Sequence, residues 1–218
     1  FFNVTPNSEG YMMRLRAPAC VVRADQMDVL AHCAEAFGGG YSHVTTRGSI
    51  QIREIRPKSV PSFIEALESV GLTAQGTGAD SARNLTVTPT AGFDADELVD
   101  MTAQAKKLSQ RILKTRELQG IPRKFNISFD NAGRLSCLSD TKGVTLTRLD
   151  RKFERPRTPS DRQAHIGVQP QKQFGLSYIG VALELGRLSP EQMRVLAQVA
   201  RDYGEGDIRL TVWQNPII

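Results

Sequence analysis

The stretch DQMDVLAHCAEAFGGGYSHVT, from Asp25 to Thr45, occurs a second time in this chain as EQMRVLAQVARDYGEGDIRLT, from Glu191 to Thr211. The two copies align without a gap at a constant separation of 166 positions. A run of matches that keeps the same bracketing glycines predicts an internal duplication of one structural unit. Nine residues of the first copy recur at that separation: Gln26, Met27, Val29, Leu30, Ala31, Ala34, Gly38, Gly40 and Thr45.

The second copy predicts a strand, a helix and a second strand. YIGVALELG (178–186) is expected to form the first strand. Ser189 is suited to begin the helix as its N-cap, with Pro190 in the first turn and Gln192 completing a capping box. Gly204 is expected to end that helix in a left-handed conformation, and DIRLTVWQNPII (207–218) predicts the next strand.

The first copy repeats this order and extends it. YMMRLRAP (11–18) predicts a strand, a helix is expected over Met27–Phe37, and HVTTRGSIQIRE (43–54) predicts one continuous strand. A further helix has Pro61 near its start and Gly71 after its end, with Phe63 and Leu67 on its apolar stripe. The repeated unit therefore predicts a small sheet whose helices pack on one face.

Three pieces lie between the copies. TGADSARNLTVTPTAG (77–92) predicts a loop, and Asp94 is expected to cap a long helix that extends to Leu113. PRKFNISFDNAGRLSCL (122–138) predicts two strands joined by the turn Asp130–Gly133, and the segment 148–163 predicts a basic linker or surface arm. We expect four regions: the first copy over 1–75, a central segment over 76–141, a basic linker over 142–164 and the second copy over 165–218.

The overall composition limits the class of protein. The chain has 218 residues and a formal net charge of +5, which suits nucleic acid, an anionic cofactor, an acidic partner or solubility alone. No apolar run is long enough for a membrane helix, and the first residues lack a secretory signal pattern. Cys20, Cys33 and Cys137 are too widely spaced for a metal-thiolate motif, so we expect no metal site and reduced thiols in the cytoplasm.

Polar side chains alternate along three of the predicted strands. In 43–54, Thr45, Arg47, Ser49, Gln51 and Arg53 fall on one face, opposite the isoleucines. The same alternation places Arg14 beside Arg16 on one face in 11–18, and Lys124 beside Asn126 in 122–129. None of these positions is acidic, whereas a solvated face usually mixes both charge signs. The pattern therefore favours a large anionic ligand over a solvated outer face.

Several motifs closely resemble the sirohaem-dependent nitrite and sulfite reductases. They are MMRLRAP, VTTRGSIQIRE, RNLTVTPTAG, PRKFNI and the segment 167–218, and they occur in the order found in that family. The resemblance implies an α+β fold of two duplicated ferredoxin-like half-domains packed as a pseudo-twofold pair, with a central α/β insert. It implies a six-electron reduction of nitrite to ammonia, or of sulfite to sulfide. The implied cofactors are sirohaem and a [4Fe-4S] cluster, and the implied electron donor is a protein such as ferredoxin.

The resemblance also implies roles for individual residues. The substrate anion would be surrounded by Arg14, Arg83, Lys124 and Asn126. The sirohaem would be held by Thr45, Arg47, Gln51, Arg53, Arg123, Gln214 and Asn215. Asn126 favours nitrite over sulfite, because assimilatory sulfite reductases tend to carry a lysine at that position. Prepositioned cations suit this chemistry, since both substrates are anions and charge develops as bonds to oxygen break.

The sequence departs from the family in ways that bear on activity. The cysteine motifs that ligate the family's cluster are absent, so we expect the cluster domain to be missing and to be required in cis or in trans. A segment that usually follows PRKFN is also absent near residues 141–142. Gly48 stands where the family often has glutamine, and Val87 where glycine is usual, and both changes are expected to loosen haem packing.

Three alternatives to a reductase remain open from the sequence. The first is a non-catalytic relative that binds a tetrapyrrole or serves as a scaffold. A corrin-pathway monooxygenase of the same superfamily shares these motifs. A nucleic-acid-binding sheet is less favoured, because the polar face lacks paired stacking aromatics.

Overall fold

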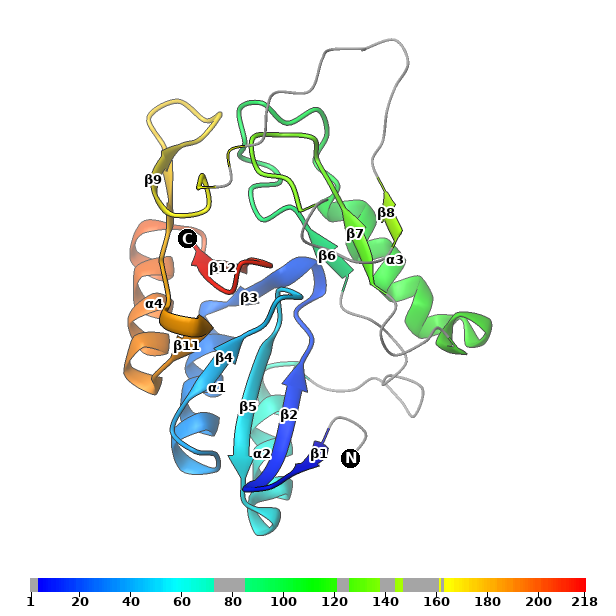
Figure 1. The fold of residues 1–218 in the computed structure, drawn as a ribbon, viewed down its shortest axis with the longest axis vertical. Coiled ribbons are helices and arrows are strands. Elements are labelled where there is room, and N and C mark those ends of the chain that lie inside the picture. The colour runs from blue at the N-terminus through cyan, green and yellow to red at the C-terminus, as the bar shows by residue number, and fades with distance from the viewer. Residues whose placement is uncertain (1–3, 73–84, 121–125, 138–143, 147–160, 162) are drawn as a thin grey trace.

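The computed structural model describes residues 4–72, 85–120, 126–137, 144–146, 161 and 163–218 (Figure 1). These residues form two five-stranded sheets, a parallel three-stranded sheet and four α-helices, joined by short 3-10 turns. None of the helices in this part of the chain has the length and apolarity needed to span a lipid bilayer. The mixed architecture with a duplicated unit agrees with the fold class predicted from the sequence.

Sheet A contains most strands of the first copy, in the order β1-β2-β5-β4-β11. Figure 1 shows these strands in front of helices α1 (Ala24–Ala36) and α2 (Val60–Ser69). The two helices cover one face of the sheet and leave the other face free of helices. The strands are β1 Val4–Asn7, β2 Gly10–Leu15, β5 Ile50–Ile55, β4 Ser42–Val44 and β11 Arg187–Leu188.

Sheet B contains most strands of the second copy, in the order β3-β12-β13-β10-β9. Helix α4 (Pro190–Tyr203) is its counterpart of α1. The strands are β3 Val21–Arg23, β12 Asp207–Leu210, β13 Pro216–Ile217, β10 Ser177–Gly180 and β9 Gly167–Pro170.

The two copies exchange one strand each. β3 precedes α1 in the first copy but pairs with β12 in sheet B, and β11 precedes α4 in the second copy but pairs with β4 in sheet A. Val21 is opposite Arg209, and 166 positions away Arg187 is opposite His43. The register itself therefore repeats at the separation found in the sequence, which confirms a pseudo-twofold pair.

Backbone conformation and ion pairs repeat with the same separation. We call two residues that are 166 positions apart mates. Non-glycine residues with positive φ include Ala19 and its mate Leu185, and Gly40 (φ 79°) has Gly206 (φ 80°) as its mate. At the α1–α4 interface, Asp28 pairs with Arg201 and Glu35 pairs with Arg194. The mate of Asp28 is Arg194 and the mate of Glu35 is Arg201, so the repeat separation converts one ion pair into the other. The duplication thus extends from sequence to dihedral angles and interhelical contacts.

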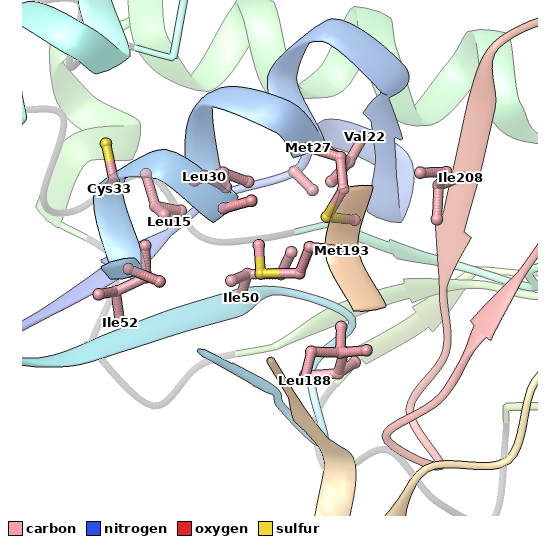
Figure 2. Close-up of a cluster of buried hydrophobic side chains, with 14 of the residues drawn as sticks. Leu15, Val22, Met27, Leu30, Cys33, Ile50, Ile52, Leu188, Met193 and Ile208 are labelled. Atoms are coloured by element: carbon pink, nitrogen blue, oxygen red, sulfur yellow. The ribbon is translucent and has the colours of Figure 1, made fainter. Parts of the chain in front are cut away.

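One hydrophobic core joins the two copies (Figure 2). Met27 on α1 and its mate Met193 on α4 are both fully buried in it, and Ser42 Oγ contacts the Met193 sulfur at 3.2 Å. Ile50 and Ile52 of β5 enter the same core from sheet A, and Ile208 of β12 enters it from sheet B. Because the core is shared, neither copy has an independent interior.

The central segment forms a separate parallel sheet, sheet C, which the sequence did not predict. Its strands are β6 (Leu85–Val87), β7 (Ile127–Phe129) and β8 (Val144–Leu146), and helix α3 (Thr102–Lys114) packs beside it. β6 lies in the segment that we expected to be a loop, and β8 lies in the expected linker. Leu135–Cys137 does not form the predicted second strand, because β7 pairs in parallel with β6 and β8 instead.

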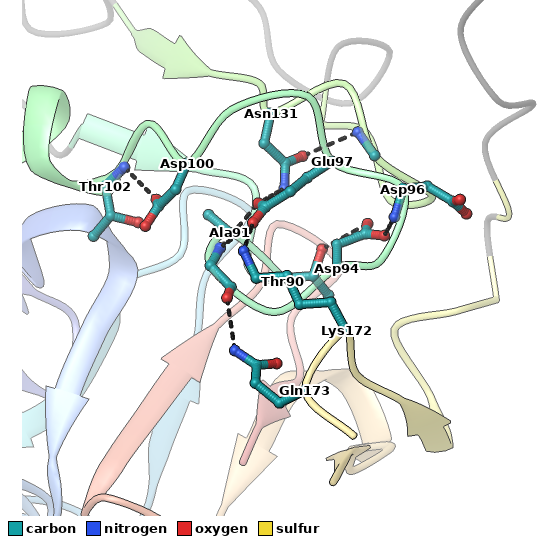
Figure 3. Close-up of polar contacts among 12 residues, drawn as sticks. Thr90, Ala91, Asp94, Asp96, Glu97, Asp100, Thr102, Asn131, Lys172 and Gln173 are labelled. Carbon is teal, nitrogen blue, oxygen red and sulfur yellow. Dashed lines mark hydrogen bonds and ion pairs between the residues drawn. The ribbon is translucent and has the colours of Figure 1, made fainter. Parts of the chain in front are cut away.

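The prediction that Asp94 caps the long helix is wrong. Helix α3 begins eight residues later, where Asp100 accepts a hydrogen bond from the Thr102 amide at 2.8 Å. Asp94 is buried and accepts from the amides of Arg134 (2.8 Å) and Asp96 (3.0 Å), which ties two loops together (Figure 3). In the same cluster Glu97 accepts from Lys172 at 2.6 Å and so links the central segment to the second copy.

Two further local predictions are corrected by the backbone. The stretch 43–54 is not one strand, because β4 and β5 are joined by a turn in which the Thr45 amide donates to the Ser49 carbonyl at 2.8 Å. The stretch 207–218 is divided in the same way into β12 and β13. Gly204 is extended (φ −134°) where the helix ends, and Gly206 takes the left-handed conformation instead.

The N-cap of α4 is confirmed and gives a measurable prediction. The Gln192 amide donates to Ser189 Oγ at 3.2 Å, and the Ser189 amide donates to Gln192 Oε1 at 2.8 Å. We expect Ser189→Ala to lower the free energy of unfolding by about 1 kcal/mol, because an N-cap side chain satisfies an otherwise unpaired helix amide. Urea unfolding checks the value, with Gln198→Ala on the exposed face of the same helix as the control, and a loss no larger than the control's would contradict the role.

Candidate functional site

Four side chains form a line across the helix-free face of sheet A. In the strand register Arg14 of β2 is opposite Gln51 of β5, Gln51 is opposite His43 of β4, and His43 is opposite Arg187 of β11. Met13, next to Arg14 on β2, points to the opposite face and is buried against the helices. We call Arg14, Gln51, His43 and Arg187 the basic row.

Arg53 extends the basic row by one further position along β5. The Gln51 amide lies between two guanidinium groups, those of Arg14 and Arg53. With its oxygen toward Arg14, Gln51 accepts from Nε at 2.8 Å and Nη2 at 2.5 Å, and with its oxygen toward Arg53 it accepts from Nη2 at 3.5 Å. One carbonyl oxygen cannot serve both groups well, so one guanidinium always faces the amide nitrogen, donor against donor. The site therefore has more donors than acceptors.

The positive charges in this region repel one another, which makes each charged form less favourable. Partial burial, followed by the charges of Arg47 and Arg53, lowers the pKa of the Arg14 guanidinium below its ordinary value. Burial, followed by the charges of Arg53 and Arg187, likewise lowers the pKa of His43. These directions show that the cations lie close enough together to repel, as a surface built for an anion would.

No carboxylate within the described ranges pairs with Arg14, Arg53 or Arg187. Glu54, which follows Arg53 in the sequence, accepts instead from the Tyr41 hydroxyl at 2.5 Å. Arg187 stacks on the Tyr41 ring, 4.0 Å from its centroid, which fixes the direction of that guanidinium. The Glu54 carboxylate is thus hydrogen-bonded to Tyr41, beside the Arg187 end of the basic row.

Thr45 and Arg47 lie on the turn between β4 and β5 rather than on a strand. Thr45 Oγ1 lies 2.9 Å from Ser49 Oγ, and it accepts from the Arg47 amide at 3.3 Å. The turn therefore carries Arg47 at its tip, near enough to Arg14 to lower that residue's pKa. Arg47 joins the same charged group even though the strand predicted for it is absent.

The second copy repeats this turn with Gln214 and Asn215. Thr211 Oγ1 donates to Asn215 Oδ1 at 2.6 Å, and the Asn215 amide nitrogen donates to the His165 carbonyl at 2.8 Å. Asn215 is buried and its side chain is committed to these protein partners. Gln214 donates from Nε2 to the Val44 carbonyl at 3.2 Å, which brings it beside β4. Both residues therefore hold the turn in place.

The same face of sheet B has a different character. The mates of Arg14, Gln51 and Arg187 are Gly180, Ile217 and Val21. Arg209, the mate of His43, is turned to the central segment, where it donates to the carbonyls of Pro89 and Ala91 and lies 4.4 Å from the Phe93 ring centroid. The duplication has thus produced one basic face on sheet A and one face on sheet B that contacts the central segment.

The remaining predicted residues belong to the central segment. Arg83, Arg123 and Lys124 lie outside the described residues, so their positions stay predictions. Asn126 is buried directly before β7 and donates to Ser128 Oγ at 3.3 Å. Cys20 lies between sheet C and the turn that carries Arg47, because its Sγ is 4.0 Å from both the Arg47 and the Leu85 carbonyl oxygens.

Sequence reasoning missed His43 and Arg187 as members of this site. His43 was not predicted as a site residue, although it shares the alternation of the residues that follow it. Arg187 carries no local signal, because it reaches sheet A only through the strand exchange. Val21 and Arg187 are mates, but this equivalence does not show that each of them pairs with a strand of the other copy.

The cysteines are unsuited to binding a metal in this arrangement. All three are buried, and burial raises the pKa of Cys33 and of Cys137 to about 12, which keeps both thiols protonated. Within the described ranges, no group of three or more His, Cys, Asp or Glu residues could hold a metal ion.

Two family models match the chain. Residues 4–70 and 169–218 match the nitrite/sulfite reductase ferredoxin-like half domain, and residues 78–151 match the nitrite and sulphite reductase 4Fe-4S domain. The second match places a segment of the 4Fe-4S domain within the chain, where we had expected that domain to be absent. Cys137 is the only cysteine in the sequence 78–151, so this segment lacks a cluster's ligand set.

Individual relatives agree with these matches. The chain is 27% identical over 305 residues to a ferredoxin–nitrite reductase of Synechococcus elongatus, covering 99% of this chain and 59% of that protein. It is 34% identical over 141 residues to an assimilatory ferredoxin-dependent nitrite reductase of Haloferax mediterranei, covering 60% of this chain and 24% of that protein. Because 305 aligned positions exceed the 218 residues of the chain, the Synechococcus relative contains internal segments that this chain lacks.

A solved structure shows the same fold. The NirA protein of Mycobacterium tuberculosis superposes with a TM-score of 0.72 at 18% identity, covering 95% of this chain and 53% of that one. The chain spans between half and three fifths of the length of most of the curated relatives it matches. Since the half-domain model covers more than half of the sequence, this chain belongs to the nitrite/sulfite reductase ferredoxin-like half-domain family.

Proposed function

We propose that the basic row, with Arg47 and Arg53, binds the carboxylates of a tetrapyrrole, and that the tetrapyrrole is sirohaem. The observation that carries this proposal is the convergence of four arginines and a histidine on one sheet face without a carboxylate partner for Arg14, Arg53 or Arg187 in the described residues. Sirohaem carries many carboxylates, and arginine pairs with a carboxylate in a two-pronged geometry. Family membership supports the choice of this ligand.

Two buried nitrogen atoms support the fit, and one of them, Arg53 Nε, is a donor. Arg53 Nε and His43 Nδ1 are buried and have no hydrogen-bond partner in the described structure. A buried polar atom without a partner is costly, and the cost is relieved when a ligand or a rearrangement supplies one. Together with the donor-against-donor contact at Gln51, the unpartnered Arg53 Nε indicates that the face is complete only when acceptors are bound to it.

We infer that the chain contributes this face to the reduction of nitrite, or of sulfite, in a larger assembly. Bound sirohaem would supply the iron chemistry for reducing the substrate. The residues of this chain would orient the macrocycle through Arg14, Arg47 and Arg53 and offset the charge of its carboxylates. Arg83, Lys124 and Asn126 are proposed to surround the substrate anion, with Asn126 favouring nitrite. Lys124 would hold a proton near the departing oxygen.

Electron delivery requires residues beyond these 218. The three cysteines are separately buried, and a [4Fe-4S] cluster needs clustered thiolates. We therefore propose that the cluster ligands are supplied by other polypeptide, in cis or in trans, and that ferredoxin is the electron donor. The competing proposal is a non-catalytic tetrapyrrole-binding or scaffold module, which the single cysteine of the 4Fe-4S segment favours. Nitrite turnover after addition of a cluster-bearing partner distinguishes the two.

The proposal is tested by the absorbance of the 218-residue chain mixed with sirohaem. We expect a shifted Soret band that saturates, and weaker binding as salt concentration rises, because the attraction is between charges. The matched control is the same macrocycle with its carboxylates esterified, which should not bind. Equal binding of the acid and the ester would overturn the assignment of the basic face, and so would the absence of any shift with the acid.

Arg47→Ala is expected to weaken binding without unfolding the chain. The loss should be about 1.5–3 kcal/mol, the range for a hydrogen bond to a charged group, because Arg47 lies at the tip of an ordered turn. Fluorescence quenching or the Soret titration gives the affinity. Arg56→Ala, at an exposed site after β5, is the control, and an unchanged affinity in Arg47→Ala would count against the turn as part of the site.

His43 provides a readout that does not depend on turnover. Burial and the charges of Arg53 and Arg187 lower its pKa below the ordinary 6.5, so the unfolded chain binds this proton more readily. The stability that this residue contributes is present above pH 6.5 and is lost as pH falls below that value. A bound polycarboxylate offsets the neighbouring cations, so we expect the pKa to rise. Proton NMR of the histidine ring, with and without the iron-free macrocycle, measures the change.

A further inference from the structure

Three large apolar side chains on the second copy are exposed where their mates on the first copy are covered. Ile179, Val195 and Tyr203 are 43%, 60% and 86% exposed. They lie on β10 and on the outer surface of α4. Their mates at the repeat separation are Met13, Val29 and Phe37, all of which pack in or against the main core. The difference therefore does not come from the residue types, which are apolar in both copies.

Helix α2 accounts for the covering in the first copy. Its residues Phe63 and Leu67 are buried, and the Phe63 ring lies 6.3 Å from the Phe37 ring, centroid to centroid. The α2 C-terminus also meets the start of α1, where Gln26 donates from Nε2 to the Val70 carbonyl at 3.1 Å. Met13 of β2 joins the same cluster from the sheet. Figure 1 shows α2 alongside α1 behind sheet A.

In the second copy, the described residues place no helix at the corresponding position. Sheet B has α4 beside it but nothing equivalent to α2. The exposed surface extends beyond the three mates, because Val168 of the edge strand β9 is opposite Ile179 and is 68% exposed. Neighbouring exposed apolar side chains, such as Val168 and Ile179, are typical of a contact site. We call Val168, Ile179, Val195 and Tyr203 the helix-receiving surface.

We propose that the helix-receiving surface binds one amphipathic α-helix with the chemistry of α2. The occupant is specified by the repeat: an apolar stripe with the spacing of Val60, Phe63, Ile64 and Leu67, which is one face of a helix. An aromatic residue in the place of Phe63 would meet Tyr203 as Phe63 meets Phe37. The proposal concerns the back of sheet B and is independent of the tetrapyrrole face.

An extended chain tests this proposal. A copy of residues 53–72 is joined after Ile218, which is the mate of Ile52, so the added helix has the register of α2. Hydrogen exchange of β10 and α4 is then compared with that of the 218-residue chain. We expect exchange at these amides to slow by at least about tenfold, because a packed helix raises the free energy of local opening. The control extension carries glutamine in the copies of Phe63 and Leu67, and it should give no protection.

Two further measurements decide the outcome. Ile179→Lys in the extended chain should remove the protection, because a charge would then be buried under the added helix. Equal protection by the apolar and the glutamine extensions would overturn the proposal. Light scattering of the unextended chain checks the competing occupant: a dimer that Ile179→Lys dissociates would assign the surface to a second copy and overturn the helix. A monomer together with the apolar-specific protection supports it.

Discussion

Arg53→Glu is expected to abolish tetrapyrrole binding while leaving the chain at least as stable as before. Arg53 lies on the same face as Arg14 and His43, and its charge lowers the pKa of both. A carboxylate at this position would attract those cations in the free protein. It would also repel the carboxylates of the ligand, and like charges in contact cost several kcal/mol. We expect the dissociation constant to rise more than about 100-fold.

The contrast between affinity and stability makes this result diagnostic. A residue held for binding can oppose stability, so its replacement improves the free fold. Thermal unfolding and the Soret titration measure the two quantities on the same samples. Arg111→Glu, on an exposed turn of α3, makes the same change in net charge away from the face and should leave the affinity unchanged. Loss of folding in Arg53→Glu would show that the arginine is structural, and retained affinity would move the ligand elsewhere.

Gly48→Gln is expected to destabilise the chain by about 3 kcal/mol. Gly48 has a φ of 57°, which strains residues with a side chain by about 1–2 kcal/mol, and a Cβ there would overlap Cys20 Sγ, which adds an overpacking cost. The mate of Gly48 is Gln214, which adopts a φ of 65° beside Gly186, the mate of Cys20. In the first copy the side chain that fills this space belongs to Cys20 and its neighbour is Gly48. In the second copy the side chain belongs to Gln214 and its neighbour is Gly186.

The second copy supplies the rescue. A chain that carries Cys20→Gly should tolerate glutamine at position 48, because these two positions then hold the residues found at 186 and 214 in the second copy. Cys20 also has a φ of 62°, which suits glycine. Urea unfolding of both single variants and the double variant should give a favourable coupling of about 1–3 kcal/mol. Additive losses would show that the two turns do not share this packing. That Gly48 loosens haem packing stays a prediction; in the structure Cys20 fills the space that a side chain at position 48 would take.

The duplication was predictable because it is written in local patterns. The apolar stripe of each helix, the Ser189 cap and the bracketing glycines all act within a few residues, and all are confirmed except the conformation of Gly204. The two turns were missed for the same reason. Thr45, Arg47 and Ser49 alternate as a strand would, yet threonine and serine also form the hydrogen bonds of a turn. Alternation alone does not separate the two.

Features set by distant contacts were beyond the reach of sequence patterns. Asp94 seemed to be a cap because it precedes an apolar run, but its hydrogen bond to the Arg134 amide joins loops 40 positions apart. The strands of sheet C have three residues each and lie among turn-forming residues. Arg14 could be placed on the basic face from its own strand, whereas Arg187 could not, since β11 has two residues and its partner is in the other copy.

The exchange of β3 and β11 constrains how this protein is made. His43 leaves the ribosome 144 residues before Arg187, its partner in sheet A. A nascent first half therefore emerges with the edge of β4 unpaired, and contacts so distant in sequence form slowly. During that interval the unpaired edge is open to aggregation, which chaperones oppose. The basic row is likewise completed only when Arg187 joins it, so under our proposal a tetrapyrrole would bind after synthesis of the second half.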